Sequence, residues 1–234
     1  MNETGNLTCA DEYRAFIKET LDSYKCKAKY HILKELPVYD DAGELIAYLR
    51  PITSDYRKTI KDCALLMGNW RAENPSISDS VFDITVDRTE KWLDNLIIGR
   101  DDRLLFMIMT LEGRYIGHVG CSSFHYEDRT AEIDSILRGV HGVYPGIMTF
   151  AIRTLLWWGI NVINLDHIEL STGIDNKQAQ DLYRRCGFEL KNKKALVKVI
   201  MQDEVRWDPA EDPDMENAER YAVTMRYIGG KNNE

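Results

Sequence analysis

The sequence predicts a mixed α/β fold in which helices cover both faces of a central sheet, with an added helical and hairpin extension at the N-terminus. Hydrophobic residues make up 44% and charged residues 29% of the 234 residues, a balance typical of a globular protein with a full core. An antiparallel run of strands precedes a strand–helix–strand–helix–strand order, which favours a mixed sheet. We therefore divide the chain into an extension, residues 1–47, and a domain, residues 48–234.

Apolar spacing and turn signals predict the elements of the first half. Tyr13, Phe16, Ile17 and Leu21 share one face at helical spacing in a polar segment. Asp40–Gly43 is a turn signal between two short apolar runs, and Thr85 is an N-cap candidate. The expected helices cover 10–27, 55–74 and 85–98, and the expected strands cover 30–36 and 45–52.

The second half alternates strands with two helices. The long apolar helix should return the chain to a parallel strand through a right-handed crossover. We expect both Trp157 and Trp158 of this helix in the core, and Gly187 to end the second helix. The expected strands are 104–111, 115–125, 130–137, 167–172, 188–199 and 221–227, and the helices are 146–162 and 176–186.

Charge and cysteine content exclude several classes of protein. A formal net charge of −8 disfavours binding to nucleic acid or to an anionic membrane surface. No segment reaches the ~20 apolar residues that a membrane helix needs. The five cysteines are scattered without a CxxC pair, so we expect reduced thiols, no metal site and a cytoplasmic protein.

A glycine-bearing loop links the strand TAEIDSIL to the long helix. Backbone N–H groups of such a loop and the positive end of the helix dipole can bind phosphate without basic side chains. The stretch His141–Gly142–Val143–Tyr144–Pro145–Gly146, followed by Ile147, therefore predicts a phosphate site. Ordinary turn chemistry explains the same residues when they are taken alone.

The helix after the next strand carries a second pattern. Asn176, Ala179, Tyr183 and Cys186 fall at helical spacing on one face. Ala179 would let a ligand approach the helix closely, and the Tyr183 hydroxyl can donate a proton. The alternative is that Tyr183 packs in the core and the face binds nothing.

Together, strand, Gly-rich loop, long helix, strand and the pattern Asn176, Ala179, Tyr183, Gly187, Phe188 resemble the GNAT superfamily of N-acetyltransferases. The resemblance implies a GNAT fold and acetyl-CoA, whose pyrophosphate the loop amides would hold, with His141 where the family has Gln or Arg and Tyr144 where it has Gly. It implies an oxyanion donor among the strand amides near Ile136 or Leu137. It also implies that Tyr183 is the proton donor to the departing thiolate, with Asn176 and Ala179 beside the cofactor.

An acyl transfer also needs a base for the amine. Glu132 and Asp134 alternate onto one face of the strand before the loop, and burial there would raise the pKa of a carboxyl group. His125, at the end of the preceding strand, is a third candidate. The alternative is that Glu132 and Asp134 are both solvated or ion-paired. His118 lies in mid-strand, so we expect it to serve packing.

The segment GNWRAENPSIS resembles the GNAT branch that acylates nucleotide-linked amino sugars. On this basis Trp70 would stack on, and Arg71 would bind, the phosphate-bearing acceptor. The alternative is that the two residues cap and fill the end of the expected helix 55–74. The alternatives are an acceptor that is a protein N-terminus or another small amine, and a non-catalytic module that binds acyl-CoA. The enzyme could act alone or as a homodimer.

Overall fold

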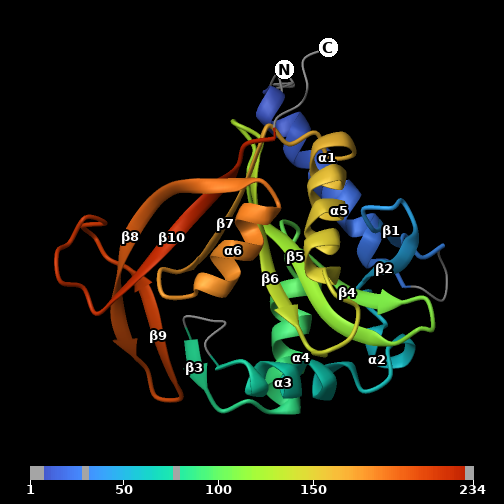
Figure 1. The fold of residues 1–234 in the computed structure, drawn as a ribbon, viewed down its shortest axis with the longest axis horizontal. Coiled ribbons are helices and arrows are strands. Elements are labelled where there is room, and N and C mark those ends of the chain that lie inside the picture. Colours follow the sequence, from blue (N-terminus) through green and yellow to red (C-terminus); the bar gives the residue numbers. More distant parts are fainter. Residues whose placement is uncertain (1–7, 28–31, 76–79, 230–234) are drawn as a thin grey trace, which may run out of the picture.

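The computed structural model describes residues 8–27, 32–75 and 80–229. Its strands form one sheet in the order β1-β2-β4-β5-β6-β7-β10-β8-β9-β3. Helices lie on both of its faces (Figure 1), and β6 and β7 form its parallel pair. The expected mixed α/β architecture is therefore confirmed.

The N-terminal segment folds onto the sheet. Helix α1 (Cys9–Lys25) begins with a capping box between Thr8 and Asp11, which satisfies the first free amides of the helix. The hairpin of β1 (Leu36–Tyr39) and β2 (Leu45–Pro51) turns at Gly43, whose φ is +80°. The first strand starts later than the expected 30–36; residues 30 and 31 lie outside the described ranges.

The helix expected over 55–74 is wrong as one element. The structure has α2 (Tyr56–Thr59) and α3 (Cys63–Glu73), because Ile60 is extended and Asp62 is left-handed with φ +53°. The next expected helix is confirmed as α4 (Val86–Trp92), which continues into the π-helical turn η2 (Leu93–Ile98). The Thr85 side chain accepts a hydrogen bond from the Arg88 amide at 3.1 Å, so Thr85 is the N-cap.

The central elements follow the sequence closely. Strands β4 (Leu104–Thr110), β5 (Tyr115–His125) and β6 (Thr130–Arg138) form the antiparallel meander. Helix α5 (Ile147–Asn161) returns the chain to β7 (His167–Gly173), which is parallel to β6. Helix α6 (Lys177–Arg185) ends before Gly187, whose φ of +91° suits the residue after a helix.

The C-terminal strands form an arm that the sequence reading covered only in part. Strand β8 (Phe188–Ile200) is 13 residues long and pairs with both β10 (Arg220–Tyr227) and β9 (Glu204–Pro209). Strand β9 pairs in turn with β3 (Ser80–Phe82), which precedes α4 (Figure 1). Strands β3 and β9 were not expected, and together they join the arm to the helices on one face of the sheet.

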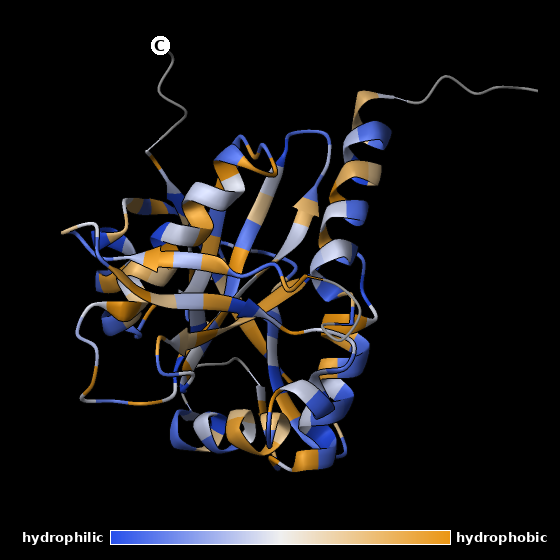
Figure 2. Cartoon of the chain, turned by 90° about the vertical axis from the view of Figure 1, so that its right-hand side faces the viewer, coloured by the Kyte–Doolittle hydropathy of each residue, from blue (hydrophilic) through white to orange (hydrophobic). Residues whose placement is uncertain are grey.

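Two apolar clusters cover the two faces of the sheet. Leu104, Phe106 and Ile108 of β4 belong to the larger cluster with α1, α5 and α6, whereas Leu105 and Met107 belong to a cluster with α2, α3 and η2. This alternation follows from the two-residue period of a strand. Helix α1 carries both hydrophilic and hydrophobic residues along its length (Figure 2) and is buried on one side only.

The expectation that both tryptophans of α5 are core residues is half wrong. Trp158 is 1% exposed and donates to the Tyr24 hydroxyl at 2.9 Å, whereas Trp157 is 60% exposed. Successive residues of a helix point about 100° apart, so both large rings could not face one sheet.

Candidate active site

The parallel strands β6 and β7 separate in the middle of the molecule. Their pairing runs from Thr130↔His167 to Glu132↔Glu169 and then stops, although both strands continue. The edges of β6 after Glu132 and of β7 after Glu169 therefore face one another without a ladder. Such a gap between two strands gives an extended ligand access to backbone groups inside the sheet.

A bulge in β6 lies beside this gap. Leu137 pairs with His118 and Asp134 with Gly120, so Ser135 and Ile136 both stand opposite Val119 of β5. Ser135 has φ +49°. A bulge of this kind redirects backbone groups out of the regular ladder.

The loop between β6 and α5 presents free amides. Within the described chain, the N–H groups of the loop residues bind no backbone oxygen at five positions: His141, Gly142, Val143, Tyr144 and Gly146. Arg138 binds the carbonyls of Val140, at 3.0 Å, and of Val143, so the loop is held by its carbonyl groups. Free amides at the start of the 15-residue helix α5 suit a phosphate group.

The remaining predicted loop residue has a different environment. Ile147 is 1% exposed in the larger core cluster, and its amide donates to the Tyr144 carbonyl at 3.2 Å. Its backbone group is therefore already occupied, unlike those of the five preceding positions.

Helix α6 brings the predicted proton donor to the same region. The Asn176 side chain accepts a hydrogen bond from the Ala179 amide at 3.1 Å, so Asn176 caps the helix. Tyr183 is 6% exposed, and burial raises the pKa of its hydroxyl above the ordinary range. The hydroxyl has no hydrogen-bond partner among the described residues and remains protonated at neutral pH, as a proton donor requires.

The two carboxylates of β6 differ in their partners. Asp134 forms an ion pair with Arg103 and accepts a hydrogen bond from Ser122 at 3.0 Å. Glu132 has no hydrogen-bond or ion-pair partner among the described residues. Burial, with the nearby charges of Asp134 and Glu169, raises the pKa of Glu132. Burial raises the pKa of Asp134 as well, and its Oδ1 has no partner among the described residues, so Glu132 differs from Asp134 in having no polar partner at either oxygen.

One cavity of about 1090 Å³ connects these features. Most of the predicted site residues line it, and six do not. The lining members are Glu132, Asp134, Ile136, Leu137, His141, Gly146, Asn176, Ala179, Tyr183 and Arg71. The others are Gly142, Val143, Tyr144, Ile147, Trp70 and His125.

The last two of these lie elsewhere for clear reasons. Trp70 is 4% exposed in the smaller core cluster, where its ring packs against Gly139 so tightly that a Cβ there would lie 2.0 Å from the ring. The Trp70 ring is therefore not presented to a ligand in the cavity. His125 is exposed at the end of β5.

The far side of the cavity is formed by the arm and by α3 and α4. Arg71 donates to the Ser80 carbonyl at 2.9 Å and lies 5.0 Å from the centre of the Phe82 ring. Arg88 lies 4.1 Å from the same ring and pairs with Glu204 of β9 at 2.8 Å. Arg71 has no carboxylate partner among the described residues, and burial lowers the pKa of its guanidinium.

Sequence reasoning missed several residues of this cavity. Phe82, Arg88 and Glu204 come from β3, α4 and β9, and no motif connects them. The only feature that these segments share in the sequence is their composition: aromatic and charged residues stand next to short runs of β-branched residues. Arg103 directly precedes β4 and lines the cavity because its partner Asp134 does.

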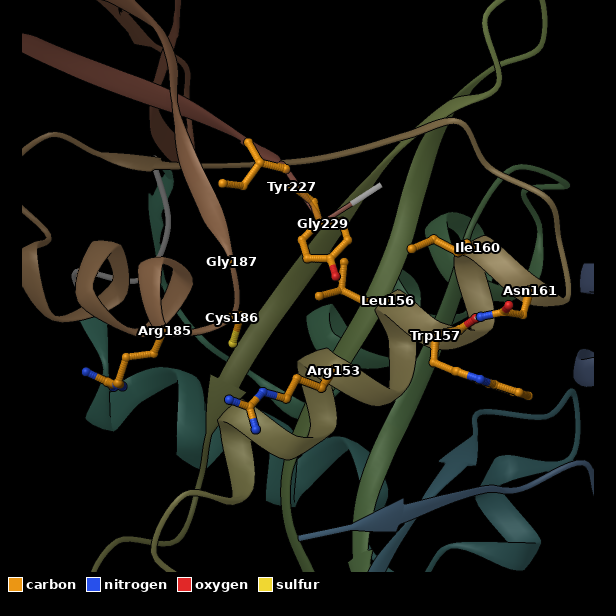
Figure 3. Close-up of a pocket in the computed structure, with 11 residues that line it drawn as sticks. Arg153, Leu156, Trp157, Ile160, Asn161, Arg185, Cys186, Gly187, Tyr227 and Gly229 are labelled. Carbon is orange, nitrogen blue, oxygen red and sulfur yellow. The ribbon is translucent and has the colours of Figure 1, made fainter. Parts of the chain in front are cut away.

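A second hollow, of about 1060 Å³, lies between the ends of α5, α6 and β10 (Figure 3). Its lining includes Arg153, Trp157 and Tyr227, and none of the free loop amides reaches it. In the part of the chain that the structure describes, no group of three metal-ligating side chains is found, and no helix is long and apolar enough to cross a membrane.

The fold is similar to that of solved N-acetyltransferase structures. A mutant of spermidine N-acetyltransferase SpeG from Vibrio cholerae matches with a TM-score of 0.54 and 18% identity, over 76% of this chain and 93% of that chain. The spermidine/spermine N-acetyltransferase SpeG from Vibrio cholerae in complex with manganese ions matches with a TM-score of 0.52 and 17% identity, over 77% and 91%. At such identity the likeness concerns the fold. No curated protein matches the sequence.

The family is shown by the sequence itself. Residues 47–189 match the acetyltransferase (GNAT) domain family, which is more than half of the chain. The matched segment contains the separated strands, the bulge, the loop with free amides and Tyr183, and these features fit acetyl-CoA as the acyl donor. The chain therefore belongs to the GNAT acetyltransferase family and is an acyl-CoA-dependent N-acetyltransferase.

Proposed function

We propose that this enzyme transfers the acetyl group of acetyl-CoA directly to the primary amine of a small molecule that also carries an anionic group. The observation that carries the proposal is the content of the cavity. Among the described residues it holds one carboxylate without a partner, Glu132, on β6, and its far side carries a guanidinium without a carboxylate partner, Arg71, on α3. A carboxylate suits an amine, and a guanidinium suits a phosphate or a carboxylate.

Three groups of the chain perform the reaction in this proposal. Glu132 accepts the proton that the amine must lose, as its raised pKa favours. The Ile136 amide, within the bulge, stabilises the oxygen that becomes negative in the transition state. Tyr183 gives its proton to the departing thiolate. Acetyl-CoA supplies the activated acetyl group.

The loop holds the cofactor in the same proposal. The amides of His141, Gly142, Val143, Tyr144 and Gly146 bind the pyrophosphate at the N-terminus of α5. Asn176 and Ala179 line the cavity at the start of α6, where the small side chain leaves room for the pantetheine arm.

We propose a nucleotide-linked amino sugar as the acceptor. Arg71 and Arg88 flank the Phe82 ring, so phosphate-binding and ring-stacking groups lie together. Phe82 takes the stacking role that the sequence assigned to Trp70. Since Glu204 neutralises Arg88, Arg71 is the one of these two cations that is left for the phosphate.

A polyamine is the second candidate, because the structural neighbours named above are spermidine acetyltransferases. A polyamine carries several positive charges and needs several free carboxylates. Asp134 and Glu204 line the cavity but are paired with Arg103 and Arg88. Glu132 alone is uncommitted among these three, which favours an acceptor with one amine. A protein N-terminus would need similar acidic or backbone contacts.

A thiol-release assay with acetyl-CoA over a panel of amines tests the proposal. We expect a nucleotide-linked amino sugar to be turned over at least tenfold better than spermidine or a peptide amine. Arg71→Ala should raise the KM of that acceptor and leave the KM of acetyl-CoA unchanged, whereas Arg88→Ala, the matched control, should change the acceptor KM less. Preference for spermidine would show that the acceptor is a polyamine, and preference for a peptide would show that the enzyme acetylates protein N-termini. Binding of acetyl-CoA without turnover of any amine would indicate a non-catalytic module.

A further inference from the structure

His118 is a buried side chain of β5 that the mechanism above does not use. It is 7% exposed, lines the cavity, and places Nδ1 2.6 Å from the Ser135 carbonyl oxygen. A carbonyl oxygen can only accept, so Nδ1 carries the hydrogen. Burial and the nearby Arg71 lower the pKa of His118 to about 4, so the ring is neutral at physiological pH.

His118 binds Ser135, the residue of β6 whose backbone departs from the extended conformation. Ser135 is the left-handed residue of the bulge, with φ +49°, and Ile136 follows it. A side chain of β5 therefore binds a main-chain carbonyl at the position where the regular ladder is interrupted. Left-handed backbone is unfavourable for a serine and persists where surrounding contacts hold it.

The direction of one carbonyl determines the direction of the next amide. The described residues contain no cis peptide bond. In a trans peptide the C=O of Ser135 and the N–H of Ile136 point in opposite directions. Because the carbonyl points to the His118 ring, the Ile136 N–H points away from that ring. Strand β7 is the neighbour of β6 on the edge opposite β5, where β6 and β7 have separated.

We infer that His118 is a positioning residue for the oxyanion donor: by binding the Ser135 carbonyl it fixes the 135–136 peptide plane and aims the Ile136 N–H at the thioester carbonyl in the gap. A hydrogen bond to the carbonyl also polarises the same peptide group, which strengthens its N–H as a donor. The inference rests on the proposed role of the Ile136 amide.

Two simpler roles for His118 give different expectations. The ring lies 6.3 Å from the Trp70 ring, so His118 could serve packing alone. Since Nδ1 is the donor, Nε2 carries a lone pair and could act as the base. Packing requires ring volume but no donor, and a base requires Nε2. Positioning requires only an N–H at the place of Nδ1.

Two variants separate these roles. His118→Phe keeps the ring and removes the donor. His118→Asn loses the ring, but its amide nitrogen lies two bonds from Cβ, as Nδ1 does. The readout is the infrared stretching band of the carbonyl in isotope-labelled acetyl-CoA bound to the enzyme, because a hydrogen bond to that oxygen lowers its frequency. Calorimetric affinity for acetyl-CoA and the melting temperature confirm that each variant is folded and loaded.

We expect the band to be lowered in the wild type and in His118→Asn, and to return most of the way to its solution position in His118→Phe. With the best amine of the panel, kcat should fall by about 10- to 100-fold in His118→Phe, with acetyl-CoA affinity unchanged, and should be largely kept in His118→Asn. If His118→Phe does not fold, His118→Leu is the donor-free variant.

Three results would overturn the inference, and a fourth would remove its premise, the role of the Ile136 amide. A lowered band in the donor-free variant shows that His118 does not position the amide. Equal rate loss in both variants with the band unchanged assigns Nε2 as the base. Full activity of His118→Phe with loss in His118→Asn assigns packing. An unshifted band in the wild type instead removes the Ile136 amide from the mechanism, and with it the premise.

Discussion

At the scale of single residues, the site separates two carboxylates that have the same position on their strand. Glu132 and Asp134 are two residues apart and project from one face of β6. Arg103 and Ser122 occupy Asp134, whereas Glu132 has no partner and has a raised pKa. Asp134 is thus held by Arg103 and Ser122 beside the bulge, although burial raises its pKa too, and Glu132 is the carboxylate that we propose for proton transfer.

Replacing Glu132 should therefore affect activity and stability in opposite directions. We expect Glu132→Gln to lower kcat/KM by about 10²-fold or more, the usual scale for a lost base. A raised folded-state pKa means that this group stabilises the fold below its unfolded pKa of about 4.3 and that the contribution is lost as pH rises through the folded pKa. Glu132→Gln should then melt higher than the wild type at pH 7 and no higher near pH 4. A lower melting temperature at pH 7 would show that Glu132 has a stabilising partner.

The Tyr183 ring belongs to the larger core cluster, as the packing alternative expects, and its hydroxyl should in addition behave as an acid. Tyr183→Phe keeps the ring and removes a hydroxyl that has no partner among the described residues, so stability should change little. We expect kcat to fall by about 10²-fold, with calorimetric affinity for acetyl-CoA unchanged. Unchanged kcat would remove Tyr183 from the mechanism and leave the thiolate to be protonated by water.

At the scale of elements, the junction of loop and helix α5 depends on backbone conformation. Gly142 and Gly146 have φ values of +77° and +80°. A Cβ on Gly142 would meet nothing within 4 Å, whereas a Cβ on Gly146 would lie 2.9 Å from the Phe150 ring. The two glycines thus have the same backbone strain but different neighbours.

Alanine substitutions at Gly142 and Gly146 should separate the cost of left-handed backbone from the cost of the steric contact with Phe150. Gly142→Ala should cost about 1–2 kcal/mol of stability for the left-handed residue alone. Gly146→Ala should cost more and should weaken acetyl-CoA binding, because relieving the contact with Phe150 moves the N-terminus of α5. Melting temperature and calorimetry measure both effects. Equal losses in the two variants would mean that the Phe150 ring moves aside freely.

The elements that carry the site differ in how far the sequence predicts them. The meander, α5, β7 and α6 were predicted because their apolar periods are long and their ends carry glycine or cap residues. The break at Asp62 and strands β3 and β9 were not, because they depend on partners far along the chain: Val81 pairs with Val205. The bulge at Ser135 was not predicted either, because no sequence pattern indicates a serine with left-handed backbone.

At the scale of the whole molecule, three parts of the chain that are distant in the sequence border the cavity. The gap between β6 and β7 opens the sheet, helices α3 and α4 border one side, and the arm of β8 and β9 reaches across to β3 (Figure 1). The pair Arg88–Glu204 joins the arm to α4 at this cavity. With a net charge of −8, the chain has no overall field that attracts an anionic ligand, so such a ligand depends on local groups such as the loop amides before α5.

Helix α1 extends the same reasoning to the N-terminal segment, which precedes the residues that match the family. Ile17 and Leu21 are fully buried in the larger core cluster together with α5, and the Tyr13 hydroxyl donates to the Ile163 carbonyl at 2.8 Å. These contacts tie α1 to the strand-crossover region of the catalytic domain. We propose that α1 folds as part of that domain, although the sequence reading assigned it to a separate extension.

Leu21→Ala tests this unity. A leucine-to-alanine change at a fully buried position costs about 2–5 kcal/mol. If α1 shares the core, urea should unfold the variant in one transition at a lower midpoint, and acetyl-CoA should raise that midpoint as it does in the wild type, because ligand binding stabilises the whole cooperative unit. Phe16→Ala, on the same helix but 42% exposed, is the matched control and should change the midpoint little. An early loss of helix signal that leaves the main transition and its response to acetyl-CoA unchanged would instead make α1 an independent extension, docked on a domain that is stable without it.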